Sequence, residues 1–118
     1  MQVLGVAIFG LLSLMTFGAA EADERLSGAE IVRLFPGAYS GIAKDGTKVW
    51  VEGEADGTLR GTADETPVSG RWWVKGERLC IEWVMLLISK KRCSYVVRDG
   101  GWYLVVKANG KERMRFRR

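Results

Sequence analysis

The chain has 118 residues, of which 18 are Lys or Arg and 14 are Asp or Glu, and its net charge is +4. It contains no histidine. This removes the usual general base, the commonest metal ligand and every Ser-His-Asp or Cys-His catalytic arrangement. We therefore expect a protein that is not an enzyme and that carries no metal and no cofactor.

The N-terminal segment differs in composition from the rest of the chain. An uncharged apolar stretch from Val3 to Phe17, followed by small residues, predicts a signal peptide over residues 1–22. Cleavage is expected after Ala22, and Ala20 is the other candidate. No Lys or Arg precedes the apolar stretch, so an uncleaved membrane anchor is the competing interpretation. Either way, the remainder is exported to the periplasm or the extracellular space.

The exported part, residues 23–118, is predicted to be one small domain that is monomeric and not integral to a membrane. The C-terminal KERMRFRR is strongly basic, but an exported chain meets lipids, glycans and proteins, so we expect no nucleic-acid partner. A domain this small has marginal stability. Cys80 and Cys93 are therefore predicted to form a disulfide, the alternative being two buried free thiols.

A short helix is predicted at the start of the domain. Ser27 and Glu30 have the spacing of a capping box, in which each side chain accepts a hydrogen bond from the other residue's backbone amide. Ile31, Leu34 and Phe35 then fall on one face, before Pro36 and Gly37 end the element. Two turns of helix are unstable alone, so this apolar face must pack on a larger element.

The chain after Pro36 predicts short strands separated by turn residues such as Asp-Gly and Asn-Gly. Nearly every connection is typical of a hairpin, and consecutive hairpins give a meander that can close into a barrel. The predicted fold is therefore mainly β, an eight-stranded antiparallel up-and-down barrel with one short N-terminal helix. The expected strands cover residues 38–44, 47–54, 58–64, 70–75, 78–84, 90–97, 102–108 and 111–117.

The register between the two cysteines raises a question about the faces of this hairpin. Pairing Cys80 with Cys93 places Glu82 opposite Lys91, which is favourable. It also sends Leu79, Ile81 and Trp83 to the face opposite Tyr95 and Val97. A β-bulge or a covering helix would resolve this conflict, so we expect the N-terminal helix near this hairpin or at one barrel end.

The last strand is predicted to present two different faces. Met114 and Phe116 alternate with Arg113, Arg115 and Arg117. This pattern indicates an apolar face toward the barrel and a basic face toward solvent.

Carboxylates are the remaining groups that could support catalysis. Glu52, Glu54 and Glu82 lie within predicted strands, and a facing pair inside a barrel could act as acid and base on a glycoside. Strand glutamates usually face water, so a carboxylate-based hydrolase is a remote alternative.

Two features are candidate binding sites. The first is the hairpin tip, whose apolar residues lie where turns normally carry Gly, Asn or Asp. Its residues, with their basic flank, are Met85, Leu86, Leu87, Ile88, Lys90 and Lys91. The second is a set of aromatic side chains that could surround a ligand at the barrel mouth or simply fill the core. These are Trp50, Trp72, Trp73, Trp83 and Trp102.

Several sequence segments carry a resemblance. The order LSGAEI, GAYSG, DGTLRG, GRWWVKGERLC, a second Cys and YVVRDGGWY resembles a group of small exported proteobacterial proteins of unknown function. In architecture the pattern is similar to calycin-like barrels, which include lipocalin-type and avidin-type binders and periplasmic inhibitors of lysozyme or proteases. The group has no settled activity, so the resemblance implies a fold and supplies neither catalytic nor ligand-binding residues.

The sequence thus predicts a non-catalytic exported binding protein that engages a protein or cell-envelope partner through the apolar tip and its basic flank. The alternative within binding is a carrier that holds a small apolar ligand among tryptophans at the barrel mouth.

Overall fold

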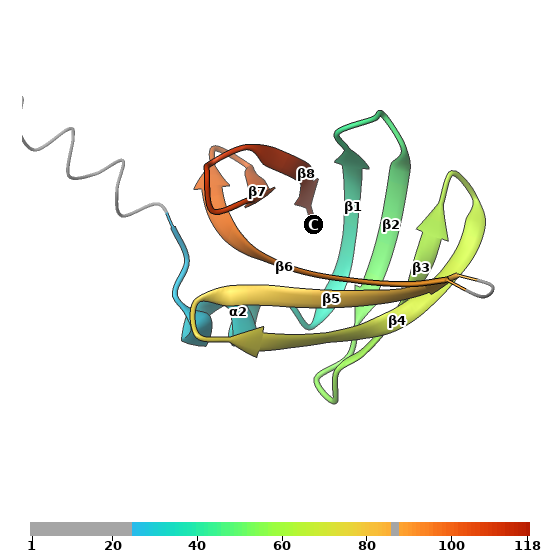
Figure 1. The fold of residues 1–118 in the computed structure, drawn as a ribbon, viewed down its shortest axis with the longest axis horizontal. Coiled ribbons are helices and arrows are strands. Elements are labelled where there is room, and N and C mark those ends of the chain that lie inside the picture. Colours follow the sequence, from blue (N-terminus) through green and yellow to red (C-terminus); the bar gives the residue numbers. More distant parts are fainter. Residues whose placement is uncertain (1–24, 86–87) are drawn as a thin grey trace, which may run out of the picture.

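The computed structural model describes residues 25–85 and 88–118 and shows eight antiparallel strands closed into a barrel, with one short helix (Figure 1). Each strand pairs with its sequence neighbours, and the first also pairs with the last. The predicted meander barrel is confirmed. The strands are β1 (Gly37–Ala43), β2 (Lys48–Gly53), β3 (Thr58–Ala63), β4 (Thr66–Lys75), β5 (Arg78–Met85), β6 (Ile88–Asp99), β7 (Trp102–Val106) and β8 (Glu112–Arg117).

The helix α2 (Gly28–Leu34) begins at the predicted capping box. The Glu30 amide donates to Ser27 Oγ over 3.2 Å, and the Ser27 amide donates to Glu30 Oε1 over 3.0 Å. The helix packs against β4 and β5 and buries Ile31, which is 1% exposed. Phe35 follows it into the barrel core, where it packs against Gly53 at a distance that leaves little room for a side chain there.

The largest difference from the predicted strands is at the start of β4. The sequence predicts a strand from residue 70, but β4 starts at Thr66, which pairs with Ala63. The two residues between the strands, Asp64 and Glu65, have φ of 48° and 69°. A two-residue turn with both φ values positive matches the twist of a hairpin, so the ladder can begin immediately after it.

The cysteine hairpin has the predicted register. Cys80 is bonded to Cys93 and Glu82 lies opposite Lys91, in a ladder with no bulge. Tyr95 and Val97 are accordingly on the outer side of β6.

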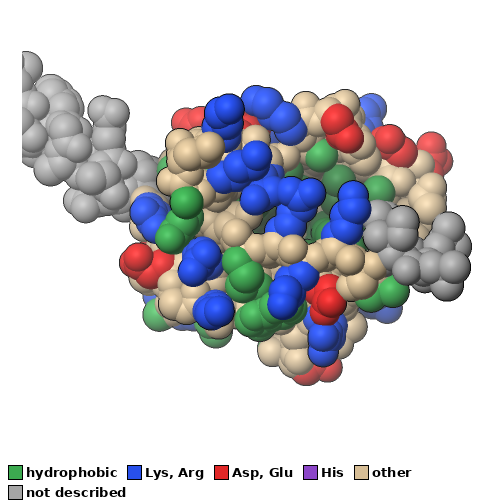
Figure 2. Space-filling model, in the orientation of Figure 1, with side chains coloured by type: hydrophobic (Ala, Val, Ile, Leu, Met, Phe, Trp, Pro, Cys, Tyr) green, Lys and Arg blue, Asp and Glu red, His purple; other side chains and the backbone are tan. Residues whose placement is uncertain are grey.

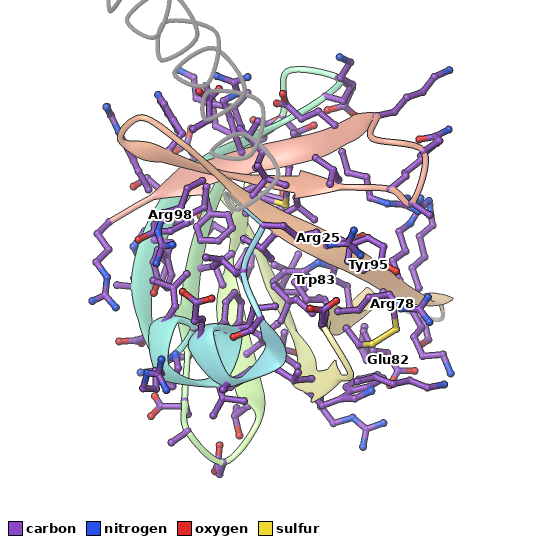
Figure 3. All side chains as sticks on the ribbon, turned by 90° about the vertical axis from the view of Figure 1, so that its left-hand side faces the viewer. Arg25, Arg78, Glu82, Trp83, Tyr95 and Arg98 are labelled. Carbon is purple, nitrogen blue, oxygen red and sulfur yellow. A yellow bond between two sulfur atoms is a disulfide. The ribbon has the colours of Figure 1, made fainter. Side chains whose placement is uncertain are left out.

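The chain before the helix covers that outer side. Arg25 forms a β-bridge with Val97, and its guanidinium carbon lies 3.4 Å from the centre of the Tyr95 ring. Arg78 also lies beside this ring (Figure 3), and the Leu26 amide donates to the Val96 carbonyl over 2.9 Å. Two residues of extended chain, and not a bulge or the helix, therefore resolve the conflict over the faces of the hairpin.

The strand directions define two ends of the barrel. The end next to α2 is filled by aromatic rings: Phe35 and Trp72 have centroids 4.9 Å apart, and Tyr39 and Phe116 have centroids 5.0 Å apart. We call this the closed end. At the other end β1 finishes at Ala43, and β5 passes into β6. We call this the open end.

The predicted signal peptide over residues 1–22, with its cleavage site, lies outside the described residues. Within residues 25–85 and 88–118, no helix has the length and apolar character needed to cross a membrane.

Candidate functional site

A cavity of about 370 Å³ occupies the open end of the barrel. Its volume is within the range of small-molecule sites. It narrows toward the closed end into an apolar recess of about 20 Å³ that reaches Phe35 and Tyr39. The two spaces share five apolar side chains, which form the floor of the cavity: Leu79, Ile81, Trp83, Val105 and Met114.

The outer part of the cavity is strongly basic. Figure 2 shows Lys and Arg side chains gathered in the middle of one face, above hydrophobic side chains that lie deeper. Glu112 is the single acidic residue of the lining. A cavity lined by one sign of charge above low-dielectric walls concentrates its electric field on its contents. We call these basic residues the basic mouth: Lys44, Lys90, Arg92, Lys107 and Arg113.

The register of the cysteine hairpin explains why charged side chains of β6 point into the barrel. Residues directly opposite each other in an antiparallel pair share a face. Lys90 is opposite Trp83, Arg92 is opposite Ile81, and Ser94 is opposite Leu79. Ser94 is 3% exposed, the one buried polar residue among those described. The inner face of β6 is therefore polar toward the open end and apolar at Val96.

Arg113 reaches the cavity through an irregularity in β8. Val105 pairs with Met114 but Val106 pairs with Glu112, so Arg113 is skipped in the ladder. Such a bulge changes the direction of the side chain, and bulges are frequent at barrel rims and beside functional sites. The prediction that Arg113 faces solvent with Arg115 and Arg117 is therefore wrong, because the bulge interrupts the alternation.

The environment of Arg113 is unusual for an arginine. Its Nε atom is buried and has no hydrogen-bond partner among the described residues. Burial, followed by the nearby charge of Arg92, lowers the pKa of the Arg113 guanidinium. An arginine stays protonated in proteins regardless, so this end of the barrel holds two neighbouring positive charges.

The single acidic residue of the lining does not neutralise these charges. Glu112 Oε2 and Oε1 accept hydrogen bonds of 2.9 and 2.8 Å from Nε and Nη2 of Arg115. This bidentate contact, above all, lowers the pKa of the Glu112 carboxyl. Within the described residues, no member of the basic mouth forms an ion pair with an acid.

The five tryptophans do not gather into one ligand site. Trp83 lines the cavity, while Trp72 is buried in the barrel core and donates through its indole to the Glu54 carbonyl over 2.8 Å. The other three lie on the outer surface: Trp50 is 42% exposed, Trp73 pairs with Cys80, and Trp102 lies under the Arg117 guanidinium. Trp72 therefore fills the core, and Trp83 is the one tryptophan of the set that lines the cavity.

The apolar tip falls largely outside the described residues. Leu86 and Leu87 are not described, and for Met85 and Ile88 the structure gives the backbone pairing that ends the hairpin. Of the basic flank, Lys90 lines the cavity and Lys91 lies on the outer face opposite Glu82. The partner-binding role of the tip therefore stays a prediction.

The strand carboxylates do not face one another in a cavity. Glu52 pairs with Arg60 at 2.7 Å, and Glu82 pairs with Arg71 at 2.8 Å on the outer surface. Glu54 is exposed beyond the end of β2. The carboxylate pair that a glycoside hydrolase would need is not formed by these three residues. In the described part of the chain, no group of His, Cys, Asp or Glu side chains could hold a metal.

Sequence reasoning missed four members of the basic mouth as site residues: Lys44, Arg92, Lys107 and Arg113. For Arg92 the signal was present, because the disulfide register places it on the same face as Ile81. Lys44 and Lys107 fall inside the expected strands 38–44 and 102–108, but β1 and β7 end one residue before them. Arg113 depends on a bulge that strand alternation does not predict.

Comparison with known proteins adds no family to this description. No protein-family model, curated protein or solved structure matches the chain. The closed eight-stranded antiparallel barrel is consistent with a calycin-like fold.

Proposed function

We propose that this protein is a non-catalytic binding protein that holds a small ligand with an apolar part in the open end of its barrel. The observation that carries the proposal is the cavity itself, whose floor is made of five apolar side chains in a barrel otherwise filled by its core. Preformed concave sites with apolar walls and a few polar groups are the usual form of small-molecule sites.

The proposal agrees with the similarity in architecture to calycin-like barrels, which include lipocalin-type and avidin-type binders. It also makes Trp83 the one tryptophan of the predicted set with a direct role, because it belongs to the apolar floor and lies opposite Lys90 in the sheet. Export, through a signal peptide over residues 1–22, is part of the same proposal.

The test uses phenylnaphthylamine, a neutral probe whose fluorescence rises in apolar surroundings, titrated into the purified protein. We expect saturable binding that Met114→Trp weakens at least tenfold, because the larger side chain fills the cavity from β8. The matched control is Ile42→Trp, which adds the same side chain on the outer face of the neighbouring strand β1.

The two variants separate the cavity from the outer aromatic surface. Ile42, Trp50 and Trp102 border a shallow groove on the outside of the barrel. Loss of probe binding in Ile42→Trp with no change in Met114→Trp would place the probe in that groove and overturn the proposal. Absence of saturable binding to the unmodified protein would overturn it as well.

A further inference from the structure

The basic mouth contains one arginine whose surroundings differ from those of the other four basic residues. Four of its five side chains are exposed, as basic groups at a surface usually are, but Arg113 is half-buried with an unpartnered Nε. A buried polar group without a hydrogen bond costs free energy. In the described residues that cost is not offset by any protein acceptor.

Arg92 and Arg113 both line the cavity. Arg92 comes from the inner face of β6 and Arg113 from the bulge in β8, and the charge of Arg92 acts on Arg113. Like charges in proximity destabilise each other unless an anion lies between them. The planar fork of arginine is suited to the two oxygens of a carboxylate or a phosphate.

The cavity therefore joins two kinds of surface over a short distance. Arg92 is directly opposite Ile81 in the sheet, and both arginines line the same cavity as the floor residues Ile81 and Met114. A ligand that satisfies both surfaces has an acidic group at one end and an apolar chain or ring at the other.

We propose that the ligand is a small amphipathic anion, with its acidic group held by Arg92 and Arg113 at the basic mouth and its apolar part on the floor formed by Ile81, Trp83 and Met114. This inference rests on the proposed function, which requires an apolar part but no charge. The acidic group is a carboxylate or a phosphate-type group, and the same two arginines bind either one.

The closed end sets a limit on the apolar part. Beyond the floor, the cavity narrows to the recess of about 20 Å³ under Phe35 and Tyr39. The aromatic packing of the closed end blocks further extension. The recess therefore limits how far an apolar group can extend from the floor toward the closed end.

The experiment compares two probes with the same ring system: anilinonaphthalene sulfonate, which is an anion, and phenylnaphthylamine, which is neutral. We expect the unmodified protein to bind the anion at least tenfold more tightly. Arg92→Gln and Arg113→Gln should each weaken the anion about tenfold and leave the neutral probe unchanged. Arg117→Gln is the matched control, because it removes the same charge from the outer face of β8.

Two further measurements identify the recognised group. Arg113→Lys keeps the charge but loses the planar fork, so it should restore only part of the affinity for the anion. Dodecanoate and dodecyl phosphate should displace the anionic probe at concentrations at least tenfold lower than dodecanol does. The ratio of the two anions then decides between carboxylate and phosphate.

Each outcome supports or overturns the inference. Equal affinity of the unmodified protein for the two probes would overturn it, because the site would then not select for an anion. An equal loss of affinity for the anionic probe in Arg117→Gln and Arg113→Gln would also overturn it, because the effect would then be one of net charge. In both cases binding of the neutral probe, with its sensitivity to Met114→Trp, would leave the proposed function standing. If the unmodified protein did not bind the neutral probe, the proposed function itself would be overturned.

Discussion

At the closed end of the barrel, the polar groups of the aromatic side chains are paired, while at the open end a guanidinium nitrogen is buried without a partner. The Trp72 indole donates to the Glu54 carbonyl, and the Tyr39 hydroxyl donates to the Leu34 carbonyl. Arg113 Nε has no such contact among the described residues. The same strands run through both ends, so the difference comes from the side chains.

This difference indicates a division of tasks along the barrel axis. Buried aromatic rings contribute most of the stability of a small core, and they are concentrated where α2 covers the barrel. Unsatisfied polar groups lower stability and are typical of sites that await a ligand. We therefore expect substitutions at the closed end to change stability without changing selectivity, and substitutions at the open end to do the reverse.

The largest expected effect is that of Trp72→Ala at the closed end. Trp72 is 7% exposed and outside the cavity lining, and removing a buried Trp side chain costs about 3–5 kcal/mol. The free energy of unfolding, measured by urea titration, should fall by this amount. Trp72→Phe, which keeps most of the volume, should lose less and remain folded. A loss below about 1 kcal/mol in Trp72→Ala would contradict the division of tasks.

At the open end, Arg113→Met should leave the free energy of unfolding unchanged or raise it by up to about 1 kcal/mol, because it removes an uncompensated and partly buried charge. The same urea titration measures it. If this variant were destabilised as strongly as Trp72→Ala, Arg113 would have a structural role and the contrast between the two ends would fail.

For Glu112→Gln we expect a smaller change in the affinity for the anionic probe, opposite in sign to the loss expected for Arg92→Gln and Arg113→Gln. Removing the one acid of the lining should increase the affinity for the anionic probe about threefold, a change typical of a single partly screened charge. Fluorescence titration checks this, with the neutral probe as the control. Weaker binding of the anion would show that Glu112 positions the site through Arg115.

The same carboxyl predicts a modest dependence of stability on pH. Since Arg115 lowers the pKa of Glu112 in the folded protein below its ordinary value of 4.5, the ion pair stabilises the protein above that pH. This stabilisation is lost as the pH falls through the lowered pKa. At neutral pH we expect the free energy of unfolding of the unmodified protein to exceed that of Glu112→Gln by about 0.5 kcal/mol. Urea titrations of both proteins should converge in acid.

The smallest effect on stability is expected for the double substitution Leu86→Ser and Leu87→Ser at the tip. Circular dichroism should show an unchanged fold, and the cavity should bind its probes as before. If the tip engages a partner, the unmodified protein should capture a protein from envelope extract and the variant should not. Equal capture by both would remove the partner-binding prediction.

The fold could be predicted because its signals are local. Asp45-Gly46, Asp56-Gly57 and Asn109-Gly110 mark hairpins, and Gly46, Gly57 and Gly110 indeed have positive φ. A chain of hairpins leaves few arrangements other than a meander. The cysteine pairing was predicted from the expected export and from the count of two cysteines, and it gave the register of β5 and β6 correctly.

The site was predicted less well because it depends on departures from regular alternation. Arg113 is directed into the barrel by a bulge that the sequence KERMRFR does not reveal, since Met114 and Phe116 keep a regular pattern around it. The sequence showed that Tyr95 would lie on the outer face of its strand, which is unusual for an aromatic residue. Arg25 covers its ring, and these two residues are 70 positions apart in the sequence. Contacts of this kind follow from the closed barrel and not from any local pattern.

The pairing of β1 with β8 has a consequence for the time course of folding. Ser40 pairs with Arg117, so the ladder that closes the barrel joins the first strand to residues at the other end of the domain. Loop-closure entropy slows the formation of such distant contacts, and closure is expected late relative to the local hairpins. Until then β1 and β8 each present an unpaired edge. A nascent chain would therefore pass through an open sheet, the stage at which edge-to-edge association competes with folding.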